Sequence, residues 1–542
     1  MNAIMSSHRL LAPACLSAAL LLALAACSAP APPLKADVDT PAAPVAAVDV
    51  VELSVANAQS GMSSGQFTSA QLVEAYLARI AAVDDSGPTL NAVISLNPNA
   101  ASDAIALDAE RAAGKLRGPL HGIPVLIKDN IDIAGMPTTA GSLAMAANVP
   151  KQDAFLVQRL RAAGAVILGK TNLSEWANFR STHSTSGWSS AGGQTRNPYV
   201  LDRNPCGSSS GTGAAIAASF ATVGVGTETD GSILCPSAVN GLVGLKPTVG
   251  VISRSGIVPI SRSQDTAGPM ARTVADAAAL MTALAGVDPS DPEAASFEGR
   301  TVADYAVGLD AASLQGKRIG VLRQAMGYHT ELDARTEEAL QAISKAGAVL
   351  IDVELPTWGQ WRQDELTVLL YEFKDGLNDY LAKGSAPVGS LEALIAWNKK
   401  NADRAMPYFA QELFDQAQAK GPLTDDAYLK ARAAARRLAG EDGLLKLLRE
   451  QRLHALIAPT TGPSWPTDLV LGDHFTGAGY GAAAVAGTPS ITIPAGEVRG
   501  LPVGVCLMGA ANSEQELLAL GAAVERAVTG RRTPHYTATL HP

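Results

Sequence analysis

The chain has 542 residues, 42 basic and 51 acidic side chains, and a formal net charge of −9. This negative balance argues against a nucleic-acid partner, because binding to phosphates depends on clustered basic residues. Five cysteines without regular spacing predict no disulfide framework, and no C-x-x-C pair suggests a metal site. The length and a hydrophobic fraction of 47% suit a large, tightly packed α/β enzyme.

The N-terminus has the layout of a secretory signal peptide: a short positive region, an apolar run over residues 10–24, and small residues after it. The segment Leu24-Ala25-Ala26-Cys27 resembles a bacterial lipobox, in which the cysteine is lipidated. We therefore expect residues 1–27 to be a lipoprotein-type signal peptide with lipidation at Cys27. An ordinary cleaved signal or an uncleaved anchor helix would give a similar pattern. Residues 28–50 are rich in Pro and Ala and are expected to form an extended tether.

After residue 50, hydrophobic periodicity predicts alternating helices and strands. The first helix is expected to start after Thr68, because Thr68 and Gln71 have the spacing of a capping box. Short, near-continuous apolar runs are typical of strands buried on both faces of a sheet. The predicted strands are 90–96, 123–127, 165–169, 223–226, 318–322, 348–353, 455–458, 490–494 and 504–508. The predicted helices are 100–113, 154–163, 214–221, 332–346 and one beginning at Ser513.

Two segments interrupt this alternation. Residues 176–213 are rich in Ser, Gly and Asn and lack periodicity, which in a compact domain indicates a functional or disordered loop. Residues 360–450 are more charged and mostly helical, and we expect them to form a helical cap inserted between parts of the α/β core. The sequence therefore predicts a single large α/β domain over residues 51–542, with a mixed, twisted central β-sheet sandwiched by α-helices.

Several cofactor chemistries lack their motifs. No G-x-x-x-x-G-K-[ST] segment is present to bind a phosphate group. Gly224 and Gly226 begin a dinucleotide-like pattern, but Thr229 stands where the third glycine is needed. The eight histidines are scattered and form no H-x-x-H or H-E-x-x-H pair. We expect neither a metal ion nor an organic cofactor.

Two Ser-rich turns remain as candidates for catalysis. Residues 206–213, CGSSSGTG, satisfy G-x-S-x-G with Ser209 at the centre, which is the nucleophile elbow of α/β-hydrolases. Residues 229–232, TDGS, follow a predicted strand and would place a serine hydroxyl beside free backbone N–H groups. Such groups can stabilise the anion that develops when a carbonyl is attacked. The residues alone leave open a nucleophile in either turn, or simple solvated loops.

Ordered sequence blocks across about residues 65–530 resemble the amidase signature family. The blocks are LHGIP and KDN within 120–130, GSS at 207–209, GTETDGSI at 226–233, NGLVGLKPT at 240–248, DTAGPM at 265–270 and GLPVG at 500–504. The GTETDGS block and the three consecutive serines are most similar to bacterial peptide amidases, which release ammonia from C-terminally amidated peptides. The resemblance implies the amidase signature fold and a hydrolase that needs no cofactor.

The resemblance also implies a Ser–Ser–Lys triad. Ser232 would be the acylated nucleophile, Ser208 the bridging serine on a cis peptide bond, and Lys128 the base. Ser209 would be a supporting hydrogen-bonder. The oxyanion hole would consist of the backbone N–H groups of Thr229, Asp230, Gly231 and Ser232.

Lys128 can act as a base only if its pKa falls about 3 units from the usual value of about 10.4. Residues 123–127 are apolar and would carry Lys128 into the interior, where desolvation lowers its pKa. From the residues alone, a salt bridge between Lys128 and Asp129 is an equal alternative. The family pattern favours the base.

The sequence departs from the commoner family pattern at three positions. Glu228 replaces an Asp, Asp230 replaces a Gly, and Leu234 replaces an Arg that is frequent two residues after the nucleophile. Leu234 argues against small acidic amides as substrates, and the Asp230 carboxylate could meet a substrate amide group. Cys206 and Cys235 lie near the site and are expected to be packing residues.

Other residues that invite a functional role have simpler explanations. The family mechanism needs no histidine, so His121, His183 and His454 are expected to be hydrogen-bonded structural residues. Tryptophans could line a peptide groove or pack in the core; they are Trp176, Trp188 and Trp465. Residues 371–373 in the helical region are candidates for shaping substrate choice.

The function that follows is hydrolysis of a carboxamide, with the C-terminal amide of peptides as the expected substrate. Small aliphatic or aryl amides are alternatives within the family. A component of a tRNA amidotransferase is a further alternative, but that work is cytosolic and needs partner subunits, whereas this chain is predicted to be exported. A non-catalytic binding lipoprotein and an α/β-hydrolase esterase using Ser209 are alternatives from other classes. We expect the protein on the periplasmic face of the cell envelope, anchored by lipid at Cys27, with no obligate protein partner.

Overall fold

The computed structural model describes residues 48–297 and 303–540. The predicted signal peptide, the lipidation site at Cys27 and most of the predicted tether lie outside these residues. The described residues form one compact unit. Within the described part of the chain, no helix has both the length and the apolarity needed to cross a bilayer.

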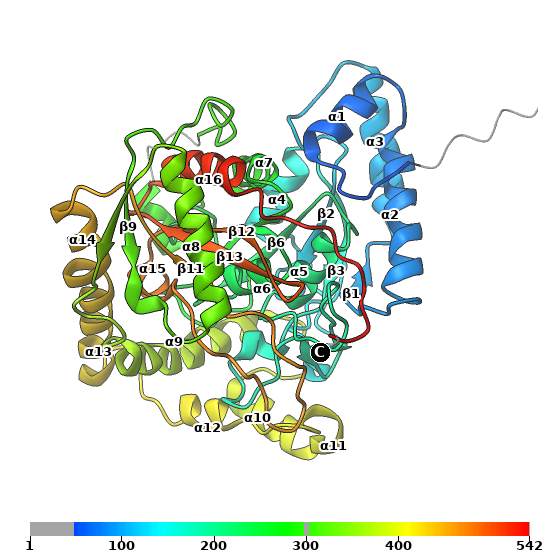
Figure 1. Cartoon of the computed structure of the whole chain (residues 1–542). Coiled ribbons are helices and arrows are strands. Elements are labelled where there is room, and N and C mark those ends of the chain that lie inside the picture. Colours follow the sequence, from blue (N-terminus) through cyan, green and yellow to red (C-terminus); the bar gives the residue numbers. More distant parts are fainter. Residues whose placement is uncertain (1–47, 298–302, 541–542) are drawn as a thin grey trace, which may run out of the picture. The chain divides into compact units, whose positions relative to one another are not determined.

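The centre of the fold is a mixed sheet of eleven strands. The strands are β1 Val93–Leu96, β2 Pro124–Lys128, β3 Val166–Thr171, β6 Val223–Glu228, β7 Val243–Lys246, β8 Thr266–Ala271, β9 Arg318–Leu322, β10 Val349–Val353, β11 Ala455–Pro459, β12 Ser490–Val498 and β13 Leu501–Met508. Their spatial order is β1-β3-β2-β6-β8-β7-β12-β13-β11-β9-β10 (Figure 1). β2 pairs in parallel with β3 and β6, and β9 pairs in parallel with β10 and β11. The other neighbours are antiparallel.

The two faces of the sheet pack against different helices. Along β13, Val505 and Leu507 join one buried cluster, whereas Cys506 and Met508 join another, because successive side chains of a strand point to opposite faces. The first cluster includes side chains of α7 (Val274–Leu284), α8 (Thr330–Lys345) and α16 (Glu514–Val528). The second includes side chains of α6 (Leu234–Val239), α14 (Leu445–Glu450) and α15 (Gly481–Ala486). The sheet is therefore sandwiched by helices, which confirms the predicted fold class.

The remaining helices of this α/β part lie before Ser232 in the chain. They are α1 Val55–Ser63, α2 Ser69–Val83, α3 Ala100–Ala112, α4 Phe155–Ala162 and α5 Ser210–Ala217. Short 3₁₀ helices are η1 Leu143–Met145, η2 Glu175–Asn178, η3 Pro292–Phe297 and η4 Arg323–Ala325. A separate two-stranded sheet pairs β4 (Trp188–Ser189) with β5 (Gly193–Gln194).

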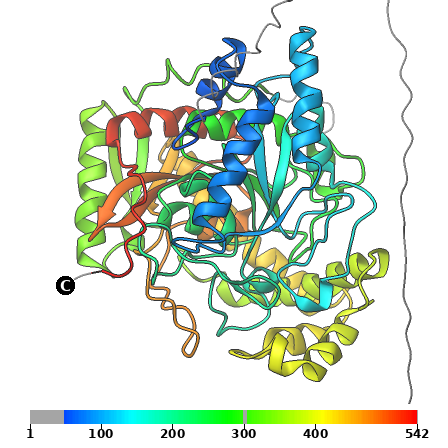
Figure 2. The ribbon, with the colours of Figure 1, turned by 90° about the vertical axis from the view of Figure 1, so that its right-hand side faces the viewer.

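Residues 362–450 fold as helices and contain no strand. They form α9 Arg362–Lys383, α10 Leu391–Lys400, α11 Ala402–Ala405, α12 Glu412–Gln418, α13 Asp426–Arg436, the π-helical segment η5 Arg437–Leu444, and α14. Phe373 and Phe414 of this segment pack with Trp176 and Phe179 in a cluster separate from the two sheet faces. The yellow helices of the segment lie on the side of the molecule away from the red helix α16 (Figure 2).

Local sequence signals predicted some element ends well and others poorly. Thr68 caps α2 and forms the capping box with Gln71, as predicted, but this helix is not the first, because α1 precedes it. Helix α5 begins at Ser210 rather than Ala214, because its first turn is made of Ser, Gly and Thr and carries no apolar periodicity. Strands β7 and β8 were not predicted, since VGLK and TAGPMA lack a long apolar run. The expected long loop contains η2, β4, β5 and the first turn of α5.

Candidate active site

The carboxyl ends of two neighbouring strands bring the first site residues together. β2 ends at Lys128 and β6 ends at Glu228, and the two strands pair in parallel with Ile127 opposite Val225. Parallel neighbours end at the same edge of a sheet, so Lys128 lies beside Thr227. All of β2 is buried, and this strand therefore carries Lys128 into the interior.

The Lys128 amine is completely buried among oxygen atoms. Its Nζ lies 2.8 Å from Ser208 Oγ and 2.8 Å from Thr227 Oγ1, and it donates to Thr227 O over 3.3 Å. Burial lowers the pKa of Lys128 to about 7, although the negative charges of Asp265 and Glu228 act in the opposite direction. A substantial fraction of the amine is therefore neutral at neutral pH, and only the neutral form can accept a proton.

The alternative salt bridge between Lys128 and Asp129 is not formed. Asp129 pairs instead with Lys170 of β3, whose Nζ lies 2.7 Å from Asp129 Oδ1, and both side chains are buried. Asp129 Oδ2 also accepts a hydrogen bond from the N–H of Thr139 at 3.2 Å. Within the described residues Lys128 has no salt-bridge partner, so its position fits a base and not a structural cation.

Ser208 lies in the turn before α5 and is completely buried. The peptide bond between Gly207 and Ser208 is cis, a feature that the family resemblance implied. The carbonyl of Ser208 accepts a hydrogen bond from the N–H of Ser174 at 3.1 Å. A Cβ at position 207 would clash with Ser174 Oγ, so a larger residue before Ser208 would displace the side chains around it.

The turn between β6 and α6 carries Ser232. Gly231 in this turn has a φ of +82°, and a Cβ there would clash with the ring of Tyr480. The buried Glu228 carboxylate accepts hydrogen bonds from the N–H groups of Ile233 at 2.7 Å and Leu234 at 3.0 Å. These contacts fix the position of Ser232 relative to the end of β6.

Ser209, at the centre of G-x-S-x-G, is completely buried. Its Oγ donates to Thr227 O over 3.1 Å and accepts from the N–H of Thr227 at 3.2 Å. Its own N–H donates to Ser232 O over 3.2 Å. Ser209 therefore joins β6 to the Ser232 turn, whereas a nucleophile elbow requires an exposed hydroxyl.

A cleft of about 670 Å³ opens onto Ser232. A much narrower space of about 10 Å³ adjoins the cleft, and Ser208, Thr227 and Ser232 all line it. This volume is roughly that of one water molecule. The two serines that the resemblance assigns to the relay therefore meet at one small space. Aromatic side chains line much of the wider cleft: Phe179, Trp358, Trp361, Trp465, Phe475 and Tyr480.

Charged side chains line the cleft as well; they are Asp230, Arg362, Glu365 and Asp473. Glu365 is buried and accepts a hydrogen bond from Gln264 Nε2 at 3.0 Å. Asp230 is open to the cleft, yet enclosure by the surrounding protein and the neighbouring Glu365 carboxyl raise the pKa of Asp230 well above its usual range. Burial also raises the pKa of Glu365. The two carboxyls therefore retain a proton at pH values where an exposed pair would be fully ionised.

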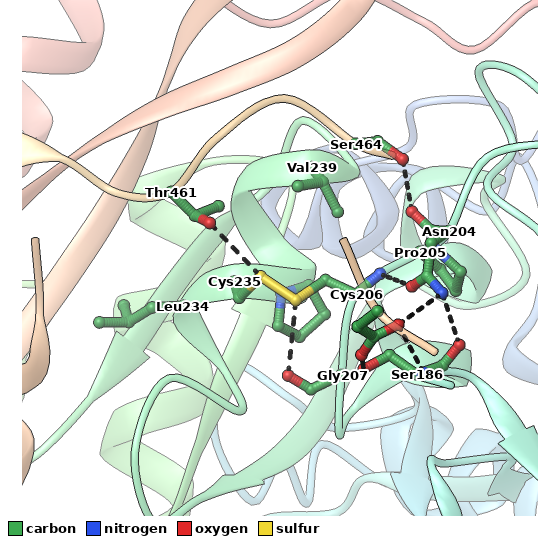
Figure 3. Close-up of a disulfide and its surroundings, with 12 residues drawn as sticks. Ser186, Asn204, Pro205, Cys206, Gly207, Leu234, Cys235, Val239, Thr461 and Ser464 are labelled. Atoms are coloured by element: carbon green, nitrogen blue, oxygen red, sulfur yellow. Dashed lines mark hydrogen bonds between the residues drawn. A yellow bond between two sulfur atoms is a disulfide. The ribbon is translucent and has the colours of Figure 1, made fainter. Parts of the chain in front are cut away.

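Cys206 and Cys235 form a disulfide, with their Cα atoms 6.0 Å apart (Figure 3). Both cysteines are buried in an apolar cluster, as expected of packing residues, but the bond between them was not predicted and corrects the interpretation of them as two separate thiols. The two cysteines are 29 residues apart in sequence, and only the return of the chain through α5 and β6 brings them together. The described residues contain one free cysteine, Cys506, which is buried; burial raises its pKa to about 12.

The three histidines have structural contacts away from the cleft. His121 is buried with Nε2 2.9 Å from Leu107 O, and His454 Nδ1 accepts from the N–H of Arg318 at 3.1 Å. His183 is exposed and lies 3.8 Å from a Glu412 oxygen. These contacts agree with the expected absence of a role in catalysis.

The tryptophans divide between the cleft and the core. Trp465 lines the cleft, whereas Trp176 and Trp188 are buried among other aromatic rings. Within the described residues, no group of three or more His, Cys, Asp or Glu side chains is arranged to hold a metal ion.

Helix α9 contributes to the cleft through residues that the sequence analysis missed. Residues 371–373, which were predicted to shape substrate choice, do not line the cleft. Glu372, for example, accepts hydrogen bonds from the hydroxyls of Ser261 and Tyr428. The cleft residues of α9 lie earlier in the helix: Arg362, Glu365 and Leu369. Their spacing of three and four residues is the helical-face signal that could have identified them.

Comparison with known proteins finds amidases that are similar to this chain over most of its length. The family model described as Amidase matches residues 71–518. The X-ray structure of a peptide amidase from Stenotrophomonas maltophilia superposes with a TM-score of 0.86 at 52% identity, covering 91% of this chain and 100% of that chain.

Two relatives in other organisms also match over most of their length. A probable amidase of Arabidopsis thaliana is 37% identical over 505 residues, which cover 90% of this chain and 92% of the relative. A glutamyl-tRNA(Gln) amidotransferase subunit from Salinispora arenicola is 36% identical over 505 residues, which cover 90% of this chain and 99% of the relative. Matches of this extent, together with the mixed sheet and the cleft at Ser232, show that the chain belongs to the amidase family and is an amidase signature hydrolase.

Proposed function

We propose that this amidase removes the C-terminal amide of peptides through a Ser232–Ser208–Lys128 relay. One observation carries the proposal. The buried Lys128 amine, which has no salt-bridge partner among the described residues, lies 2.8 Å from Ser208 Oγ. Ser208 lines the same small space as Ser232, and Ser232 also lines the cleft. A nucleophile, a bridging hydroxyl and a base are thus arranged in sequence from cleft to interior.

The contacts of the amine favour proton transfer from Ser208. A neutral lysine has two N–H groups and one lone pair. The Thr227 carbonyl can only accept, and Thr227 Oγ1 lies 2.8 Å from Nζ, so both N–H groups have acceptors on Thr227. Asn130 Nδ2 donates to the same Thr227 hydroxyl over 2.9 Å and restricts its orientation. The lone pair of Lys128 is then left for the hydroxyl proton of Ser208.

The reaction follows from this order of groups. Ser232 passes its proton to Ser208 as Ser208 passes its own to Lys128, and Ser232 Oγ attacks the amide carbonyl. The proton returns through Ser208 to the amide nitrogen, the C–N bond breaks, and ammonia leaves. Water then attacks the acyl-enzyme, giving its proton to the same relay. The net change is one amide and one water converted into one carboxylic acid and one ammonia.

The turn that carries Ser232 also supplies donors for the oxyanion. Within the described residues, the N–H groups of Asp230 and Ser232 donate no hydrogen bond, whereas those of Ile233 and Leu234 are bound to Glu228. Free amides beside a nucleophile are the donors that stabilise a tetrahedral intermediate. We assign the oxyanion hole to this turn, where Thr229, Asp230, Gly231 and Ser232 were predicted, and we take the free amides of Asp230 and Ser232 as its donors, because the N–H of Gly231 is directed to the Glu228 carboxylate.

The shape of the site supports a primary amide on an organic acyl chain. The aromatic walls and the volume of the cleft are suited to binding one or more amino-acid residues. The space between Ser208 and Ser232 has room for roughly one water-sized group, which fits ammonia as the leaving group. The similarity to a peptide amidase supports the same substrate class.

Activity of defined variants on an amidated dipeptide tests the mechanism. Lys128→Ala and Ser232→Ala are expected to abolish ammonia release, and Ser208→Ala to lower kcat about 10²- to 10⁴-fold. His454→Ala is the matched control outside the cleft and is expected to retain activity. If Ser209→Ala abolished turnover while Ser232→Ala did not, the elbow mechanism would replace this one. A wild-type protein that bound the peptide without releasing ammonia would be a binding protein.

Substrate analogues test the choice of a primary amide. The N-methylamide of the same dipeptide places an extra carbon on the leaving nitrogen and is expected to be turned over at least about tenfold more slowly, because the narrow space has no room for it. Equal rates for the two amides would overturn the assignment. Faster turnover of small aliphatic or aryl amides than of the dipeptide amide would favour the alternative substrate classes.

The predicted export is part of the same proposal. Disulfides persist in oxidising compartments such as the bacterial periplasm, and Cys206 and Cys235 are joined. This bond supports a location on the periplasmic face of the envelope, with lipidation at Cys27 as the only membrane contact. The proposed partners are amide substrates, without nucleic acid and without an obligate protein partner.

A further inference from the structure

The Cys206–Cys235 disulfide joins the two turns that carry the proposed relay serines (Figure 3). Cys206 lies two residues before Ser208, and Cys235 lies three residues after Ser232. The ring closed by the bond contains both serines together with α5 and β6. The bond therefore lies beside the chemistry and not at the periphery of the fold.

The turn of Cys206 is anchored through Asn204. The N–H of Cys206 donates to Asn204 Oδ1 over 2.8 Å, and the N–H of Asn204 donates to Trp465 O over 2.7 Å. Ser464 Oγ donates to the Asn204 carbonyl over 2.5 Å. The anchor of this turn is therefore the segment after β11, which also forms a wall of the cleft.

The turn of Ser232 is anchored elsewhere, through β6 and the carboxylate of Glu228. Non-covalent links between the two turns include a hydrogen bond from the N–H of Ser209 to Ser232 O at 3.2 Å. Asn240 Nδ2 adds bonds to the carbonyls of Pro205 at 3.0 Å and Pro236 at 2.7 Å. In addition to these hydrogen bonds, the disulfide links the turn of Ser208 covalently to the turn of Ser232.

A proton relay is sensitive to such a link. Transfer from Ser232 to Ser208 requires their oxygens to stay within about 2.6–3.2 Å of each other. A misplacement of about 1 Å in an active site can cost about 10²-fold in rate. Of the two serines, Lys128 contacts only Ser208. The lysine therefore cannot by itself fix the distance between the hydroxyls of Ser208 and Ser232.

We propose that the Cys206–Cys235 disulfide is a positioning element that holds Ser208 and Ser232 at relay distance. This inference rests on the proposed Ser232–Ser208–Lys128 mechanism. Opening the disulfide leaves the substrate cleft in place but lets the turn of Ser208 move relative to the turn of Ser232, and the chemical step slows.

Two large apolar clusters stabilise the fold in addition to the bond. Both cysteines belong to a buried apolar cluster that also contains Leu234, Leu456 and Met508 and that spans α6, β11 and β13. Alanine at both cysteine positions keeps apolar side chains in this cluster. The opposite face of the sheet has a separate and larger core, which the disulfide does not touch.

A dithiol reductant approaches the bond from the cleft, which Cys206 lines with 4% of its surface exposed. Its thiolate attacks Cys206 Sγ and displaces Cys235 as a thiolate, which takes up a proton. The second thiolate of the reductant then releases Cys206 and closes the reductant to a cyclic disulfide. The two electrons that reduce the protein thus come from the reductant.

Kinetics of the full-length Cys206→Ala/Cys235→Ala variant test the proposal. The expected result is a fall in kcat of at least about tenfold with KM within about threefold of wild type, because the cleft is retained. Wild type treated with dithiothreitol, with circular dichroism unchanged, is expected to fall to the same kcat and to recover on reoxidation. An unchanged kcat in both cases, or a change confined to KM, overturns the proposal.

Two controls separate positioning from other effects of thiols. The double alanine variant is expected not to respond to dithiothreitol, so a further loss in that variant would assign the effect to another group. Cys506→Ala removes the buried free thiol and is expected to keep wild-type kcat and the wild-type response to the reductant. If the double variant does not fold, the reduction of folded wild type decides the outcome.

The failure of this inference can be told from failure of the proposed function. If Lys128→Ala and Ser232→Ala remain active, the relay itself is wrong. If those variants are inactive while the disulfide-free protein keeps wild-type kcat, the relay stands and only the positioning role is excluded.

Discussion

Lys128 and Lys170 show how local contacts give two buried lysines different roles. Lys128 is the last residue of β2, and Lys170 is the next-to-last residue of the adjacent parallel strand β3. Both side chains are completely buried. Burial lowers the pKa of each. Lys170 faces the Asp129 carboxylate at 2.7 Å, which favours its charged form. Lys128 faces the hydroxyls of Ser208 and Thr227 and one carbonyl, so nothing in direct contact compensates a positive charge.

The pH dependence of turnover is expected to follow Lys128. The base must be neutral, and its pKa is lowered to about 7, so kcat/KM rises as the pH increases through about 7 and levels off above it. The measurement is ammonia release from an amidated dipeptide between pH 5 and 9. Lys128→Arg is the matched variant, since a guanidinium stays protonated, and it is expected to be inactive throughout. A wild-type rate that fell through this range would contradict the assignment of Lys128 as the base.

Lys170 is expected to matter for stability and not directly for chemistry. Lys170→Met leaves the Asp129 carboxylate buried without its partner, and breaking a buried ion pair in this way costs about 3–5 kcal/mol. Urea unfolding followed by circular dichroism measures the loss. Lys383→Met is the control, because Lys383 and its partner Asp379 are both largely exposed, and its midpoint is expected to stay at the wild-type value. Equal midpoints for the two variants would show that the Asp129–Lys170 pair contributes little.

At the scale of elements, the site is built where strands end and glycines allow tight turns. β2 and β6 deliver Lys128 and the Ser232 turn to the same edge of the sheet. Gly231 permits the positive φ of that turn. Glu228, the last residue of β6, then bonds the two amides that follow Ser232. Ser232, the proposed nucleophile, is thus held by the strand before it and the helix after it.

Glu228 is expected to be a positioning residue for the nucleophile. Glu228→Ala removes the acceptor of the Ile233 and Leu234 amides, and kcat is expected to fall about 10- to 100-fold because Ser232 is no longer held at its position. Glu228→Gln keeps an acceptor oxygen and is expected to retain more activity than the alanine variant. Steady-state kinetics give kcat and KM, and circular dichroism checks the fold. An alanine variant as active as wild type would show that the turn holds without Glu228.

Sequence patterns predicted the parts of this site that depend on local or consecutive residues. The apolar strand before Lys128 and the order of the signature blocks were sufficient to bring Lys128, Ser208 and Ser232 forward as candidates. The partner of Asp129 was not predictable, because Lys170 lies on another strand and only sheet pairing brings it close. The disulfide was missed for the same reason, since no local pattern links cysteines separated by 29 residues.

The walls of the cleft were predicted less well than the proximity of Lys128, Ser208 and Ser232. They come from segments that approach only after folding, such as the turn at Trp361, the start of α9 and the loop at Trp465. Helix α9 was expected to contribute residues 371–373, but its cleft-facing residues lie nearer its N-terminus because the helix begins beside the cleft. Hydrophobic periodicity identifies a helix and its apolar face, but not which of its turns meets a particular cavity.

At the scale of the whole molecule, every group proposed to act on substrate belongs to one compact unit. The described residues form that unit, and the relay and the lining of the cleft all lie between Lys128 and Gly481. The predicted signal and lipid anchor lie before it in sequence. Catalysis and membrane attachment are therefore expected to be separable functions of the chain.

Separate variants of the N-terminus test this division. A chain that begins at residue 48 is expected to keep wild-type kcat and KM, because it retains the whole cleft and relay. In the full chain, Cys27→Ser removes the lipidation site and is expected to leave kcat unchanged while moving the protein from the membrane fraction to the soluble fraction. Activity and immunoblotting of fractionated cells measure both effects.

A wild-type protein already in the soluble fraction would indicate an ordinary cleaved signal, and a Cys27→Ser protein still in the membrane would indicate an anchor helix. Loss of activity in a folded chain that begins at residue 48 would show that the N-terminal segment contributes to the site.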